Sequence, residues 1–206
     1  MSHTWEGGFH ESATSYYAAV GYLCNQWGHV EHFVYSLGAV ALNMPLKMHG
    51  ILFRHMGVVS VMQFIQDYVA EHHPRPHFEQ IKHVKAYVDL CRKNRNLIVH
   101  STPDTAEDGT SILRASPDKN RKVSREYPIS TEMVRRVCDE CETAGWLLIR
   151  AQIILSPKET LQELEKTKMW ARIEPTLFSK PPLPTDLAAN PRIARMLQDQ
   201  PQSSEE

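Results

Sequence analysis

The sequence lacks any long apolar run. No stretch of its 206 residues approaches the roughly 18 apolar residues that a membrane-spanning helix needs. The first eight residues contain no cationic segment, and no apolar segment typical of a secretory signal follows them. We therefore expect a cytoplasmic protein with no membrane partner, whose four cysteines are free thiols in a reducing compartment.

Several signatures of catalysis and cofactor binding are also missing. The chain has no glycine-rich phosphate loop, no G-x-S-x-G elbow and no H-E-x-x-H motif. Cys138 and Cys141 form a C-x-x-C pair, but it has neither the strand–helix context of a redox motif nor a second pair of zinc ligands. The histidines that group without a zinc spacing are His29, His32, His72, His73, His77 and His83. We expect neither a metal nor another cofactor.

The formal net charge is only −1, so no global field favours a polyanionic partner. The charge is unevenly distributed, however. Residues 75–125 carry eleven Lys or Arg against six Asp or Glu, whereas residues 1–74 and 126–206 each carry three more acidic than basic residues. This basic middle section favours a phosphate-bearing partner, and the alternative is an ordinary solvated face.

Apolar residues recur at alternating spacings of three and four in several segments, a pattern that only an α-helix brings onto one face. The clearest seam consists of Tyr16, Val20, Leu23, Trp27, Val30, Val34, Leu37 and Ala41. The same reasoning predicts helices over residues 51–69, 76–100 and 131–155, and a shorter helix that opens at Ser156 as its N-cap.

Residues 103–128 are rich in Pro, Asp, Gly and Ser, which interrupt helices. Two short pieces, Ser111–Ala115 and Arg121–Tyr127, are predicted to pair as a small hairpin. The predicted fold is therefore all-α: a four- to five-helix bundle with a small β-hairpin insertion between the third and fourth helices. We assign residues 1–172 to the bundle and residues 173–206 to a flexible, Pro-rich C-terminal tail.

Arg95 occupies an unusual position for a charged residue. At 100° per residue it lies on the apolar stripe of the helix predicted over residues 76–100. Because an unpaired guanidinium out of water costs several kcal/mol, some group must compensate it. An acidic side chain such as Glu31, a neighbouring subunit, or a cleft that holds phosphate would each do so.

His100 lies five residues after Arg95, which is about 140° around an ideal helix. Asn96 lies four residues before His100 and shares its face. Arg95 and His100 converge only if the helix end bends, or if two copies of the helix meet across a two-fold axis. The spacing therefore favours a composite site in a homodimer.

The sequence Arg95-Asn96-Leu97-Ile98-Val99-His100 resembles the R-x(4–6)-H signature of the HEPN superfamily, in its common form with Asn after the Arg. Glu31 is similar to an acidic residue on the first long helix of many members, and the resemblance covers roughly residues 12–155. It implies metal-independent RNA cleavage at a dimer interface, through attack of the 2′-hydroxyl that leaves a 2′,3′-cyclic phosphate. In that scheme His100 is a general acid or base, Arg95 stabilises charge on the phosphorane, and Asn96 positions the phosphate or fixes His100.

Basic side chains near this motif are candidates for binding the RNA backbone. They are Lys82, Lys85, Arg92, Lys93, Arg121, Lys122 and Arg125. The resemblance also implies a setting in toxin or phage defence, or in RNA maturation, with a protein antitoxin as a further partner. Two alternatives stay open: a non-catalytic HEPN-like module that binds RNA, a nucleotide or a protein, and a structural helical protein in which Arg95 is internally paired.

Overall fold

The computed structural model describes residues 11–53, 55–106, 109–115, 125–167, 170–189 and 192–193. Its helices are α1 (Glu11–Ala41), α2 (Leu46–Phe53), α3 (Val58–His72), α4 (Arg75–His100), α5 (Thr131–Leu155), α6 (Lys158–Glu165) and α7 (Trp170–Ile173), followed by a 3-10 turn (Glu174–Thr176). Its strands are β1 (Thr102–Thr105), β2 (Ser111–Ala115), β3 (Arg125–Pro128) and β4 (Arg192–Ile193).

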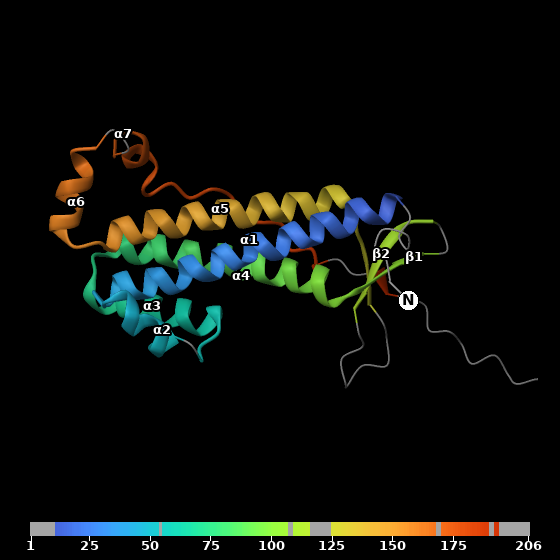
Figure 1. Ribbon diagram of the computed structural model, residues 1–206, viewed down its shortest axis with the longest axis horizontal. Helices are drawn as coiled ribbons and strands as arrows, with labels where there is room; N and C mark the ends of the chain where they lie inside the picture. The colour runs from blue at the N-terminus through green and yellow to red at the C-terminus, as the bar shows by residue number, and fades with distance from the viewer. Residues whose placement is uncertain are drawn as a thin grey trace, which may run out of the picture.

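Three long helices, α1, α4 and α5, lie side by side along the molecule, with α3 packed against α1 and α4 (Figure 1). Helices α1 and α5 are parallel: Ala19 of α1 contacts Cys138 of α5, and Phe33 contacts Gln152. Helix α4 runs antiparallel to α5. The predicted seam of α1 is buried from Leu23 onward, which confirms the periodicity as the source of the core.

The second predicted helix is in fact two. Residues 51–69 were expected to form one helix, but α2 starts earlier, directly after Pro45, and α3 begins after Gly57. The break lets Phe53 fold back onto α1 at Gly38, where a Cβ atom would lie only 2.6 Å from the Phe53 ring. The absence of a side chain at Gly38 is therefore what allows the two helices to approach.

The fold is mostly helical but not purely all-α, which corrects the predicted class. Strands β1, β2, β3 and β4 form one antiparallel sheet in that order. The predicted pairing of Ser111–Ala115 with the segment before α5 is confirmed for Arg125–Pro128, and residues 121–124 lie outside the described residues. Strand β1 was missed because Pro103 is unfavourable within a sheet, although the edge position tolerates it.

Two serines differ in how they act at helix ends. The Ser130 hydroxyl accepts a hydrogen bond from the Met133 amide at 3.1 Å and caps α5. Ser156 does not cap the next helix: its hydroxyl donates to the Gln152 carbonyl at 2.8 Å, and α6 begins only after Pro157. Within the described ranges, no helix combines the length and apolar character needed to cross a bilayer.

The chain after α7 does not leave the bundle. It runs back along the helices from the α6–α7 end to the sheet end (Figure 1). Leu177 and Pro184 are buried in this course, and β4 pairs with β3 at the edge of the sheet. The domain boundary after residue 172 and the flexibility of the tail stay predictions, because position alone does not measure motion.

Replacing Gly38 with alanine should destabilise the protein. The new methyl group would overlap the Phe53 ring, which is buried and has little room to move. We expect the free energy of unfolding, measured by urea denaturation, to fall by about 1–3 kcal/mol. The matched control is Gly28→Ala in the same helix, where nothing lies within 4 Å and helix propensity favours alanine. Equal stability of the two variants would contradict this packing.

Candidate functional site

The Arg95–His100 motif forms the last turns of α4, which is helical through His100. Arg95 is partly buried on the packed side of the helix, whereas His100 is exposed on the opposite side. Their separation of about 140° around the helix axis means that one chain does not bring both side chains to one point. This agrees with the geometry expected from their spacing.

Asn96 is the residue that contacts Arg95. Arg95 Nη1 donates a hydrogen bond to Asn96 Oδ1 at 2.9 Å. Arg95 Nε is buried and has no hydrogen-bond partner among the residues that the structure describes. Asn96 thus fixes the direction of the guanidinium rather than of His100, and part of that guanidinium keeps an unused donor.

Glu31 does not compensate the charge of Arg95. The constant offset between α1 and α5 places Glu31 level with Arg150. Asn94, the neighbour of Arg95, instead lies beside Glu140, ten residues earlier along α5 and thus about 15 Å away. Across the described ranges, Arg95 forms no ion pair. The internally paired arrangement with Glu31 is therefore not formed.

Two of the predicted RNA-binding residues share a face of α4 with His100. Lys82 and Lys93 are exposed. Lys93 lies eleven residues after Lys82, and His100 lies seven residues after Lys93, so the three side chains form one row along the outer face of α4. Arg125 is exposed at the start of β3. These side chains are accessible to a phosphate backbone.

The other predicted basic residues are less available. Lys85 Nζ lies 3.4 Å from one carboxylate oxygen of Asp89, and Arg92 Nε lies 3.9 Å from the other. This pairing reduces the charge that either residue offers to RNA. Arg121 and Lys122 lie outside the described residues.

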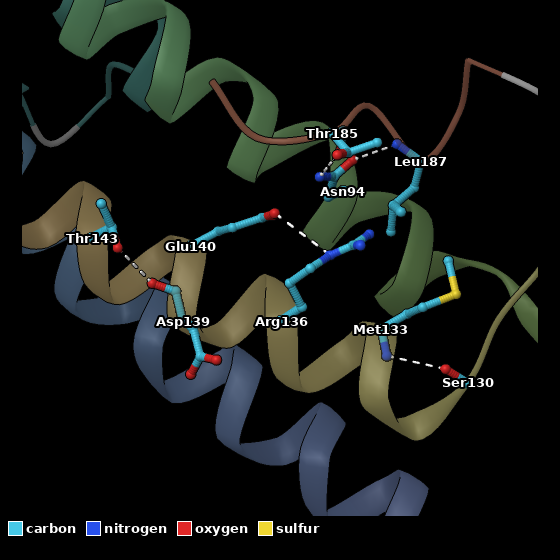
Figure 2. A network of polar contacts seen from close by, with 9 residues as sticks. All are labelled: Asn94, Ser130, Met133, Arg136, Asp139, Glu140, Thr143, Thr185 and Leu187. Carbon is cyan, nitrogen blue, oxygen red and sulfur yellow. Dashed lines mark hydrogen bonds and ion pairs between the residues drawn. The ribbon is translucent and has the colours of Figure 1, made fainter. Parts of the chain in front are cut away.

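Two buried amide side chains on α4 were missed in the sequence. Asn94 is 1% exposed, and its amide both donates to the Thr185 carbonyl at 2.8 Å and accepts from the Leu187 amide at 3.0 Å (Figure 2). Gln80 is fully buried and donates to the Ser179 carbonyl at 3.3 Å. The two residues are fourteen positions, or two heptads, apart and so lie on the same flank of the apolar stripe. This spacing is the sequence signal that could have identified them as a pair.

The carboxyl group of Glu140 lies next to Asn94 and points toward Arg136 (Figure 2). Burial raises the pKa of Glu140, while the Arg136 guanidinium, 3.7 Å away, and the Asn94 amide offset part of that rise. This carboxylate is therefore engaged by Arg136 and Asn94, and the described contacts include no ion pair between it and Arg95.

Neither a protein-family model, nor a curated protein, nor a solved structure matches the chain. The HEPN resemblance thus stays a prediction that rests on the motif. In the described part of the chain, no three His, Cys, Asp or Glu side chains lie close enough together to hold a metal ion.

Replacing Arg95 with methionine should leave the protein as stable as the parent. Methionine keeps most of the apolar packing and removes a partly buried cation that has no ion pair in the described structure. We expect the free energy of unfolding to change by less than about 1 kcal/mol in urea denaturation. Lys93→Met is the exposed control. A loss of about 3 kcal/mol or more would reveal an internal partner for Arg95 and support the structural alternative.

His83 generates a pH dependence of stability. Burial lowers the pKa of His83, the Lys180 ammonium lowers it further, and a hydrogen bond with the Pro181 backbone offsets part of the decrease. Because the unfolded chain takes up this proton more readily, the contribution is fully present above about pH 6.5 and is lost as the pH falls. His83→Gln should reduce the decrease in unfolding free energy between about pH 7 and pH 5. His29→Gln, an exposed control, should show the parent's decrease.

Proposed function

We propose that the chain is a metal-independent endoribonuclease of HEPN type, with a site made of Arg95, Asn96 and His100 from two copies. The observation that carries this proposal is the partly buried guanidinium of Arg95. It is oriented by Asn96, and no carboxylate among the described residues neutralises it. A cation held in this way is suited to an anionic ligand, and the phosphorane of RNA cleavage is such an anion.

The chemistry needs a proton acceptor near the 2′-hydroxyl, and His100 supplies it. Imidazole titrates close to neutral pH and exchanges protons efficiently there. As His100 removes the proton, the 2′-oxygen attacks phosphorus, the bond to the 5′-oxygen breaks, and that oxygen takes up a proton. A 2′,3′-cyclic phosphate remains, and the need for a 2′-hydroxyl makes RNA the substrate instead of DNA.

The opposite directions of Arg95 and His100 support a two-chain site. In a symmetric dimer, Arg95 of one copy faces His100 of the other, and the pair occurs twice. The row of Lys82 and Lys93, together with Arg125, would then guide the RNA backbone toward each pair.

A second candidate is a non-catalytic HEPN-like module that binds RNA, a nucleotide or a protein partner. It is favoured by the exposure of His100, which makes no hydrogen bond or ion pair with a described residue that would hold it in a catalytic direction. Such a module would bind RNA with a strong dependence on salt and without turnover.

The purified protein should cleave RNA in the presence of EDTA and leave cyclic phosphate ends. His100→Ala should lower the rate about 100-fold or more, since general acid–base catalysis is lost. Product ends are identified by mass spectrometry, and His29→Ala serves as the exposed histidine control. Binding without cleavage by the parent protein across varied RNAs would instead favour the non-catalytic module.

Mixing two inactive variants tests whether the site is shared. Arg95→Ala and His100→Ala chains, refolded together in equal amounts, form mixed dimers with one intact pair. We expect about a quarter of the parent activity to return, since about half of the dimers are mixed and each has one of two sites. Each variant alone should stay inactive. No recovery in a mixture shown to contain mixed dimers would place the complete site on a single chain.

A further inference from the structure

The tail from Leu177 to Leu187 follows α4 from its start toward its end. Near the start of α4, the Phe178 ring stacks on His77 with centroids 6.0 Å apart. Gln80 then holds the Ser179 carbonyl, and Arg150 of α5 donates to the Ser179 hydroxyl at 2.8 Å. Further along both chains, Asn94 holds the backbone on either side of residue 186.

The composition of the tail suits this docking. Pro181, Pro182 and Pro184 favour an extended polyproline conformation before docking, so little conformational entropy is lost. Prolines also lack a backbone donor that burial would leave unpaired. Side chains of α4 bind the backbone of the tail: the buried amides of Gln80 and Asn94, and the imidazole of His83 at Pro181.

In the described structure, Asn94 is the last side chain of α4 that binds the tail before the Arg95–His100 motif. Both halves of its amide are used by the tail, one as donor to Thr185 and one as acceptor from Leu187 (Figure 2). Arg95 and Asn96 follow it directly in the helix. Any displacement of the tail at this point therefore acts on the backbone that carries the guanidinium.

The tail then reaches the sheet on the far side of the motif. Asp186 accepts a hydrogen bond from the Ala188 amide at 2.9 Å, which turns the chain. Arg192 and Ile193 pair with Glu126 and Arg125 of β3. The sheet follows His100 in the chain, and its strand β2 lies between β1 and β3 and packs on α4. The tail therefore links Asn94 to the sheet that begins directly after the motif.

We infer that this tail is a clasp, and that Asn94 is a positioning residue which holds the Arg95–His100 turn of α4 in its working direction. This inference rests on the proposed ribonuclease function. The tail does not cover the site, because Asn96 lies about 160° from Asn94 around α4, and Lys82, Lys93 and His100 lie about 100–120° from it. Release of the clasp should therefore reduce activity, not increase it.

Two substitutions in the full chain each disrupt the hydrogen bonds between Asn94 and the tail, one in the tail and one in α4. Leu187→Pro removes the amide that donates to Asn94, and Leu187→Ala is its control, since it loses the same side chain but keeps that donor. Asn94→Asp keeps the size of the side chain but presents an oxygen to the Thr185 carbonyl and places a charge beside Glu140.

Hydrogen exchange measured by mass spectrometry, without RNA, shows whether the tail contacts protect the backbone amides of α4. We expect the segment 95–100 to exchange about tenfold faster in Leu187→Pro and Asn94→Asp than in Leu187→Ala. In RNA cleavage, both variants should lose about tenfold in kcat with KM within about twofold, because misplacement affects the transition state while the exposed lysines still bind RNA. A general loss of folded protein would also lower the apparent kcat at constant KM, but it would speed exchange throughout the chain. Faster exchange confined to the tail and segment 95–100 therefore separates release of the clasp from unfolding.

The outcomes distinguish the two proposals. Faster exchange confined to the tail, with segment 95–100 unchanged, overturns the clasp. Faster exchange in segment 95–100 with unchanged kcat also overturns it as a control of activity. Faster exchange in segment 95–100 in a protein that cleaves no RNA supports the mechanical clasp and removes only the ribonuclease proposal.

Discussion

The packing of α1 along α5 is the constraint on which the rest of the structure depends. The two helices run parallel with their apolar seams facing each other. Contacting residues of α1 and α5 differ by the same amount in residue number at both contacts, so each position on α1 has a fixed neighbour on α5. Helix α4 completes the layer in the opposite direction. This arrangement decides which side chains meet: it brings Asn94 to Glu140 and keeps Glu31 away from Arg95.

Arg95 differs from Lys85 and Arg92, the other partly buried Lys and Arg residues of α4, which both lie beside a carboxylate. Lys85 and Arg92 share the carboxylate of Asp89, and on α5 Arg136 lies beside Glu140. Arg95 instead has a neutral amide as its partner. The contrast within one helix is what distinguishes the candidate site from its surroundings.

The sequence predicted what depends on neighbours three or four residues away. The seams of α1, α4 and α5 are of this kind, and the β2–β3 pairing joins two pieces of chain separated by one short loop. The directions of Arg95 and His100 also followed from helical periodicity alone. In contrast, the break before α3 depends on Phe53 meeting Gly38, and the tail contacts join residues more than ninety positions apart. No local pattern contains such information, and the proposed partnership of Glu31 failed for the same reason.

The hydrogen bonds from Gln80 and Asn94 bind the main chain of the tail. Gln80 and Asn94 bind carbonyl and amide groups that every non-proline residue has, and Lys180 and Leu183 remain exposed. The exposed side chains of Lys180 and Leu183 thus take no part in these hydrogen bonds. This stretch is a place where the chain can acquire new surface chemistry, such as a modification site or an affinity tag, while the helices beneath it keep their arrangement.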